Sequence, residues 1–278
     1  MARARTPARR ASNADLPAHN PSRRRRRKRA WTAYAWILLL LIPAALFIGR
    51  WYVLHSTWMY PSLGVQVPPG FGSVGLDVSR WNGRIQWSDI ATSSVRTDFV
   101  WIKATEGLDW RDPQFNRNRE GAEAAGFYNG AYHFFSPSRD AREQARHFWK
   151  VAALEPGDLP PVLDLESDAG LSSEELQRRM RAWLDEMRSL CACKPVVYTN
   201  QYYYRKLLAG TTDTVTLWIA AYERPDLPLL QEDERVLFWQ FAQTGRVNGI
   251  REKTDLNVFS GDTTDLRQWI NESWKPTQ

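Results

Sequence analysis

Residues 161–166 read PVLDLE, an apolar run of strand length that ends in two carboxylates. Side chains alternate between the two faces of a strand, so Val162, Asp164 and Glu166 point the same way. We therefore expect Asp164 and Glu166 to act together at the carboxyl end of this strand. Similar apolar runs that alternate with helical patterns lie at residues 73–79, 99–107, 127–135 and 195–200.

The segments between these runs have the hydrophobic period of a helix. Ser172 and Glu175 have the spacing of a capping box, which predicts a helix start at this point. The apolar face of that helix consists of Leu176, Met180, Trp183, Leu184, Met187 and Leu190. The preceding helix has a similar face of Ala141, Ala145, Phe148, Trp149 and Ala152. Five strand-then-helix units predict a parallel sheet with both faces covered.

The pattern changes after Gly210. Residues 217–222, 236–243 and 255–261 have the composition of strands without a convincing helix between them, and a short helix is expected at 264–271. Five β/α units plus three further strands make eight, the number that closes a barrel filled by side chains. We predict an α/β fold, a modified TIM-like barrel, with an open doubly wound sheet as the alternative.

Carboxylates from three strands are expected at one end of this barrel. The carboxyl ends of the strands in β/α barrels form the mouth, where catalytic groups lie. Asp77 holds the matching position near the end of the first strand. The connection at 245–254 is too short for a crossover helix, so the last strand should run antiparallel and place Asp255 at the mouth as well. The predicted catalytic residues are Asp77, Asp164, Glu166 and Asp255.

The same rim carries further candidate contacts for a substrate. Four carboxylates could hold a hard cation, but carboxylates beside aromatic faces are more typical of a carbohydrate cleft. We therefore predict a carbohydrate site with no metal ion and no cofactor. For Lys103 and Glu106 a plain ion pair at the rim is an equally good interpretation. The predicted substrate-binding residues are Lys103, Glu106, Tyr132, Phe134, Tyr198, Trp218, Tyr222 and Gln240.

Positive charge is concentrated at the N-terminus. The chain has 278 residues and a formal net charge of +6, with 37 Lys and Arg against 31 Asp and Glu. Eleven of the basic residues lie within residues 1–30, where Asp15 is the one acid. The remainder is mildly acidic, which argues against a nucleic-acid partner, because counterion release requires a dense cationic surface.

Residues 31–48 read WTAYAWILLLLIPAALFI, eighteen residues without a charge. This length can cross a bilayer as a helix, and the arginines at 23–27 place the N-terminus in the cytoplasm by the positive-inside rule. A cleaved secretory signal is the alternative, but no clear cleavage site follows Ile48. We predict a single-pass cell (inner) membrane protein with its catalytic domain on the periplasmic or extracytoplasmic side. Its segments would be a disordered basic tail (1–30), a transmembrane anchor (31–54), a linker (55–72) and the catalytic domain (73–278).

Cys191 and Cys193 are the two cysteines of the chain, and they stand at the end of an expected helix. A disulfide across one intervening residue would depart from relaxed bridge geometry. A zinc site is not expected, because no further Cys or His lies nearby at ligand spacing. We therefore expect two buried or loosely paired thiols.

Taken in order, these segments resemble glycoside hydrolase family 25, the Chalaropsis-type lysozymes or N-acetylmuramidases. The matching stretches are GLDVSRWNGRIQW, FVWIKATEG, DPQFNRNREGAEAAGFYNGAYHFF, PPVLDLES, PVVYTN, LWIAAY, FWQF and TDLNVF, within residues 73–261. The resemblance implies a barrel of five β/α units plus three strands. It also implies hydrolysis of the β-1,4 bond between N-acetylmuramic acid and N-acetylglucosamine in peptidoglycan glycan strands. The four acids named above match the family's motif positions.

A glycosidase needs a proton donor and a group that stabilises the cationic transition state. Repulsion between close carboxylates raises the pKa of one of them, so we expect Glu166 as general acid and Asp164 as its ionised partner. Both come from one strand, which favours assistance by the 2-acetamido group of the sugar, oriented by Asp164. Asp77 and Asp255 would bind hydroxyls or tune the pair. A non-catalytic peptidoglycan-binding module and a glycosidase for chitin-like polymers remain alternatives.

Overall fold

The computed structural model describes residues 41–45, 58–60, 63–93, 96–212, 214–222, 224 and 226–275. The chain divides into two compact units, Met1–His55 and Ser56–Gln278. In the first unit, residues 41–45 are helical. The predicted tail at 1–30, and the predicted anchor at 31–54 apart from 41–45, lie outside the described residues. Within the described part of the chain, no helix has the length and apolar character needed to cross a membrane.

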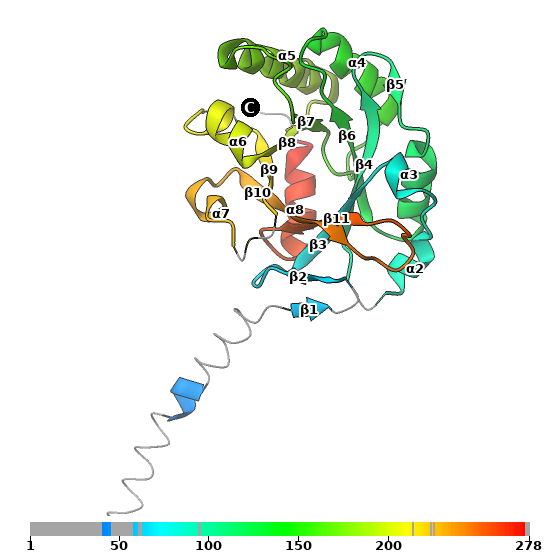
Figure 1. Cartoon of the computed structure of the whole chain (residues 1–278), viewed down its shortest axis with the longest axis vertical. Helices are drawn as coiled ribbons and strands as arrows, with labels where there is room; N and C mark the ends of the chain where they lie inside the picture. Colours follow the sequence, from blue (N-terminus) through cyan, green and yellow to red (C-terminus); the bar gives the residue numbers. More distant parts are fainter. Residues whose placement is uncertain are drawn as a thin grey trace, which may run out of the picture. The chain divides into compact units, whose positions relative to one another are not determined.

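Eight strands of the second unit close into a barrel (Figure 1). Their order around the barrel is β3 (Ser73–Val78), β11 (Thr254–Phe259), β10 (Val236–Gly245), β9 (Thr216–Ala220), β8 (Val196–Asn200), β7 (Val162–Asp164), β6 (Tyr128–Phe134) and β4 (Phe99–Glu106), which pairs back with β3. A ninth strand, β5 (Trp110–Arg111), pairs with β4 outside this ring. Strand β11 is antiparallel to both of its neighbours, whereas the other neighbouring pairs of the ring are parallel. The predicted barrel and its antiparallel last strand are confirmed.

Helices follow the strands in the predicted alternation. The longer ones are α3 (Phe115–Ala124), α4 (Ala141–Ala152), α5 (Ser173–Cys191) and α8 (Thr263–Ser273). The shorter ones are α2 (Trp87–Ala91), α6 (Gln201–Tyr203), the π-helical turn η2 (Tyr204–Leu208) and α7 (Leu229–Glu232). The Ser172 hydroxyl caps α5 by accepting the Glu175 N–H, but the Glu175 carboxylate binds Arg178 and Arg179 instead of completing the capping box.

Leu190, predicted on the buried face of α5, is instead exposed. It lies in the last turn of the helix, beyond the buried stripe that ends at Met187.

Alternate side chains of each strand fill the interior of the barrel. On β4, Phe99 and Trp101 belong to the interior cluster, whereas Val100 and Ile102 face the surrounding helices. Gly75 makes room for this packing, because a Cβ atom at position 75 would lie 2.3 Å from the Phe99 ring. The middle of the barrel is thus a packed core. Only inward-facing residues at the ends of the strands can form a binding or catalytic site.

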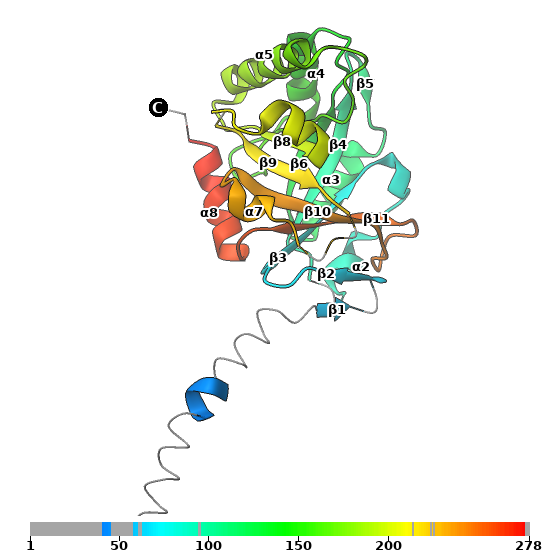
Figure 2. The same ribbon diagram turned by 60° about the vertical axis from the view of Figure 1, so that its left-hand side comes forward.

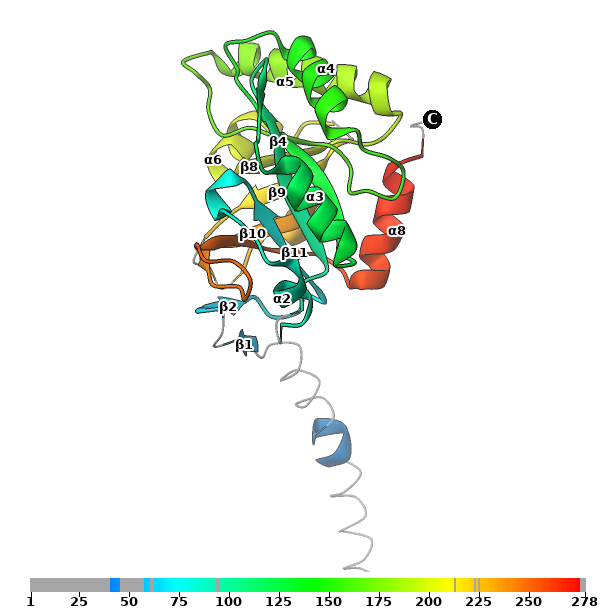
Figure 3. The ribbon, with the colours of Figure 1, turned by 90° about the vertical axis from the view of Figure 1, so that its right-hand side faces the viewer.

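Helix α8 closes the amino-terminal end of the parallel strands. Leu266 and Ile270 are buried in the interior cluster, and the Trp269 ring lies 4.9 Å from the Phe238 ring. Figure 2 shows the β10–β11 hairpin extending away from α8, and Figure 3 shows α6 and α8 on opposite sides of the barrel. The opening of the barrel is therefore at the carboxyl ends of its parallel strands, as the sequence predicts.

The structure corrects the prediction that residues 55–72 are a linker. Strands β1 (Trp58–Tyr60) and β2 (Val65–Val67) form an antiparallel pair in this segment. Leu63 and Val67 are buried in the hydrophobic core. Folded structure therefore begins before Ser73.

The two cysteines form a disulfide instead of remaining thiols, which corrects a second prediction. The Cα atoms of Cys191 and Cys193 are 5.1 Å apart, within the usual range for a bridge. Ala192 adopts a left-handed conformation with φ 50° at the end of α5, and this turn brings the two residues together. Alanine adopts this conformation rarely, so the spacing of the cysteines did not predict it.

Candidate active site

The four predicted acids line one cavity of about 390 Å³ at the barrel mouth. Asp77 on β3 lies directly opposite Asp255 on β11 in the register of the two strands. Asp164 is the last residue of β7, and Glu166 follows two residues later. Three separate strands therefore bring these carboxyl groups together, as the predicted topology requires.

Asp164 and Glu166 differ in their surroundings. Asp164 is 5% exposed, whereas Glu166 is the first exposed residue after β7. The intervening Leu165 holds the chain at the strand end, because its N–H donates to the Tyr198 carbonyl (2.9 Å) and its carbonyl accepts the Thr199 hydroxyl (2.6 Å). Glu166 therefore stands at the open rim, with Asp164 below it.

Burial raises the pKa of Asp164 well above its usual value, and the charge of Glu166 adds to the rise. Burial therefore opposes ionisation of Asp164 in the unliganded site, and the ionised role of this carboxyl stays a prediction. Among the described residues, Asp164 Oδ1 is buried without a hydrogen-bond partner. This oxygen has an unused capacity to accept a hydrogen bond.

Asp77 is held by an amide that two phenols orient. Gln240 Nε2 donates to Asp77 Oδ2 over 2.8 Å. The hydroxyls of Tyr198 and Tyr222 both donate to Gln240 Oε1, each over 2.7 Å. Burial raises the pKa of Tyr198, and it raises that of Tyr222 to about 12, so both phenols remain neutral donors at physiological pH. The three predicted contacts thus form one network with Asp77.

Asn257 supplies a second amide that sequence reasoning missed. Its Nδ2 donates to Asp77 Oδ2 over 2.8 Å, and its Oδ1 accepts the Trp218 indole N–H over 2.8 Å. Asn257 lies two residues after Asp255 on the same strand, so the alternation of side chains could have identified it. Trp218, predicted as a substrate contact, lines the cavity and also fixes this amide.

Two of the acids form a pair that retains a proton near neutral pH. Burial raises the pKa of Asp77 to about 6, although the hydrogen bonds from Asn257 and Gln240 oppose the rise. Burial, followed by the charge of Asp77, raises the pKa of Asp255 to about 8. Two close carboxyl groups cannot both ionise easily, so one proton is shared between them.

Replacing Asp255 with asparagine should stabilise the fold at alkaline pH and have little effect near pH 4. A carboxyl group whose pKa is raised by folding favours the folded state while it is protonated. That contribution is lost as the pH rises from the unfolded value through the folded value of about 8. We expect a rise in Tm of about 5 °C at pH 9, measured by thermal unfolding between pH 4 and pH 9. A Tm difference that is independent of pH would contradict this prediction.

Lys103 and Glu106 form the ion pair that was the alternative interpretation. Lys103 Nζ lies 2.8 Å from Glu106 Oε2 and 4.4 Å from the centre of the Phe134 ring. Lys103, Phe134 and Tyr132 line the cavity, whereas Glu106 does not. The structure therefore places Glu106 behind Lys103, where it neutralises and orients the ammonium group.

The cavity has further lining residues that the sequence did not single out. They lie in the turn after β3, in the loop before β11 and, in the case of Gln243, near the end of β10. These residues are Ser79, Trp81, Asn82, Gln243 and Lys253.

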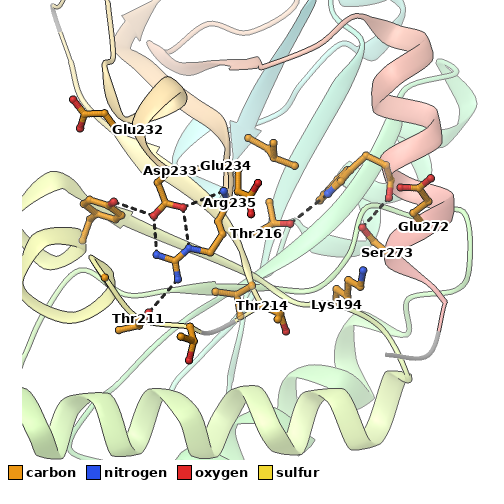
Figure 4. A pocket seen from close by; sticks show the side chains of 16 residues that line it. Lys194, Thr211, Thr214, Thr216, Glu232, Asp233, Glu234, Arg235, Glu272 and Ser273 are labelled. Carbon is orange, nitrogen blue, oxygen red and sulfur yellow. Dashed lines mark hydrogen bonds and ion pairs between the residues drawn. The ribbon is translucent and has the colours of Figure 1, made fainter. Parts of the chain in front are cut away.

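A larger cavity of about 700 Å³ lies beside α8, at the closed end of the barrel (Figure 4). Arg235 donates to both carboxylate oxygens of Asp233 (2.9 and 2.7 Å) and to the Thr211 hydroxyl (3.0 Å). The two partly buried charges neutralise each other, and no predicted site residue lies there. This cavity is therefore not the candidate active site.

The mouth combines an exposed acid, a buried acid beside it and several neutral hydrogen-bond donors. Such a set can protonate a leaving oxygen and stabilise a cationic sugar ring, which are the requirements of glycosidic bond cleavage. Within the described ranges, no three His, Cys, Asp or Glu side chains are grouped so that they could hold a metal ion. The exposed acid, the buried acid and the neutral donors support acid-assisted chemistry by the protein's own side chains.

Known proteins share this part of the chain. The model of the glycosyl hydrolases family 25 matches residues 76–250, which include Asp77, Asp164 and Glu166. The uncharacterised protein YegX of Escherichia coli K12 is 37% identical over 215 residues, covering 76% of this chain and 78% of YegX. Lysozyme M1 of Streptomyces globisporus is 30% identical over 221 residues, covering 73% and 72% of the two chains. The crystal structure of a bacterial lysozyme from Streptomyces coelicolor superposes with a TM-score of 0.66 at 29% identity, covering 73% of this chain and 98% of that one.

Proposed function

The chain belongs to glycosyl hydrolase family 25, and from this membership we propose that it is a lysozyme-type muramidase. It would hydrolyse the β-1,4 bond between N-acetylmuramic acid and N-acetylglucosamine in peptidoglycan. The observation that carries the proposal is the cavity in which exposed Glu166 stands two residues beyond buried Asp164. Lysozyme M1 and the Streptomyces coelicolor lysozyme support the same activity.

Glu166 would protonate the leaving glycosidic oxygen while the acetamido carbonyl oxygen of the muramic acid residue bonds to the anomeric carbon. Water would then attack that carbon and break its bond to the acetamido oxygen. The Glu166 carboxylate would take up the proton from the water. The acetamido N–H is a donor for the unpartnered Asp164 Oδ1. This hydrogen bond, and the positive charge on the acetamido group, would lower the pKa of Asp164 and favour its ionised form during the reaction.

Digestion of purified peptidoglycan by the full chain tests the proposal. We expect new reducing ends of muramic acid, identified by borohydride reduction and mass spectrometry of the fragments. Reducing ends of glucosamine or anhydro ends would contradict a muramidase. Peptidoglycan binding without release of fragments would indicate a binding module, and cleavage of chitin alone would indicate a chitin-directed glycosidase.

We also propose that residues 31–54 anchor the protein in the cell membrane, with residues 1–30 in the cytoplasm. The uncharged stretch at 31–48 and the preceding arginines support this topology. The full chain should sediment with membranes after carbonate extraction, and a variant lacking residues 31–48 should not. Release of the full chain by carbonate would contradict the proposal. An anchored muramidase would act on the wall of the cell that produces it.

A further inference from the structure

Few large hydrophobic side chains of the described barrel unit are exposed, and two of them lie at the mouth. Trp81 is 71% exposed and Tyr202 is 61% exposed. Trp81 lies in the turn η1 (Arg80–Asn82) directly after β3, and Tyr202 lies in α6 directly after β8. A third such residue, Leu190, is 37% exposed at the far end of α5, away from the mouth.

The two aromatic residues stand on opposite sides of the mouth. Three strands separate β3 from β8 in either direction around the ring, namely β11, β10 and β9 on one path and β7, β6 and β4 on the other. Residues that follow β3 and β8 therefore face each other across the opening. The acid-lined cavity lies between them, and Trp81 itself lines it.

Trp81 is fixed in spite of its exposure. The Arg80 guanidinium lies 4.0 Å from the centre of the Trp81 ring, on one face of the indole. The Ser79 hydroxyl accepts the backbone N–H of Trp81 over 3.3 Å, and the Asn82 side chain accepts the backbone N–H of Ser79 over 2.8 Å, which fixes the turn that carries the indole. A rigid indole with an open face loses little conformational entropy when a ligand stacks on it.

Tyr202 is connected to the segment that carries Glu166. The Asn200 side chain accepts the Tyr202 N–H over 2.9 Å, and Lys206 Nζ lies 5.5 Å from the centre of the Tyr202 ring. The same ammonium group pairs with Asp168 over 3.2 Å, two residues beyond Glu166. The Tyr202 ring is therefore held beside the segment that carries Glu166.

We propose that Trp81 and Tyr202 are stacking platforms at the two ends of a glycan-binding groove that crosses the mouth, with the acids between them. A pyranose ring presents an apolar C–H face that packs on an aromatic ring. The inference rests on the proposed muramidase function and deepens it. If both rings bind the glycan, affinity depends on the length of the strand on each side of the cleaved bond. The favoured substrates are strands that reach both rings.

Kinetics of Trp81→Ala and Tyr202→Ala on peptide-free glycan strands test this inference. Each substitution should raise the KM for long strands about 2- to 12-fold, because an aromatic contact contributes about 0.5–1.5 kcal/mol. In Tyr202→Ala, whose ring lies outside the acid-lined cavity, kcat and the KM for the shortest oligosaccharide that the enzyme cleaves should not change. Trp81→Phe should recover most of the affinity, and Leu190→Ala, the matched exposed control, should resemble the wild type.

Unchanged KM of both variants for long strands, or an equal rise in the KM of Tyr202→Ala for short and long substrates, would overturn the inference while the proposed function stands. A binding measurement also separates the inference from the proposed function. In the Glu166→Gln background, Trp81→Ala should weaken sedimentation with insoluble peptidoglycan by a similar factor. Unaltered sedimentation of this double variant would also overturn the inference, whereas an inactive wild type would refute the muramidase function alone.

Discussion

Replacing Glu166 with glutamine should lower kcat on peptidoglycan by about 10³-fold while leaving binding intact. Glutamine has nearly the same shape as glutamate but cannot donate the proton that the leaving oxygen needs. Glu166 is exposed beyond the end of β7, so the fold does not depend on its charge. Release of reducing ends measures the rate, and sedimentation with insoluble peptidoglycan measures binding.

A matched control is available on α3. Glu120 is an exposed glutamate on this helix, outside the cavity, and Glu120→Gln should keep wild-type activity. Substantial activity of Glu166→Gln, within about tenfold of the wild type, would show that another group donates the proton.

Replacing Asp164 with asparagine should lower kcat by about 10²-fold and make the fold more stable at the same time. Asparagine cannot stabilise the positive charge on the acetamido group as a carboxylate does. Burial raises the pKa of Asp164, so the contribution of this carboxyl to folding is present at low pH and lost as the pH rises through the folded pKa. The stability gain of the variant should therefore be absent at low pH and grow towards alkaline pH, as thermal unfolding will measure.

The role of Asp164 can be tested on a second substrate. De-N-acetylated peptidoglycan lacks the group that Asp164 is proposed to orient, so it should be a poor substrate for the wild type. On this substrate Asp164→Asn should lower kcat little further, because the substitution and the missing acetyl group remove the same interaction. Full additivity of the two effects would contradict assistance by the acetamido group.

The barrel and its acids could be predicted because both depend on simple periodicity. Alternation along PVLDLE placed Asp164 and Glu166 together, and the short connection before Asp255 set the direction of β11. The same reasoning applied to TDLNVF would have included Asn257. These features follow from strand geometry alone.

Features that depend on irregular backbone could not be predicted in this way. The disulfide requires the left-handed Ala192, and Trp81 lies in a turn where no period indicates the direction of the side chain. The state of Asp164 depends on how deeply it is buried, which follows from packing around the strand end and not from its distance to Glu166 in sequence. Such properties belong to the assembled structure.

Strand β11 has a consequence for when the protein becomes active during synthesis. It pairs with β3 on one side and β10 on the other, and it supplies Asp255 and Asn257. A ribosome delivers residues 254–259 after every other strand of the ring, so until then β3 and β10 expose unpaired edges and Asp77 lacks the Asn257 amide. A nascent chain therefore contains Glu166 before it contains a complete site, and the site cannot be complete until translation has passed Phe259.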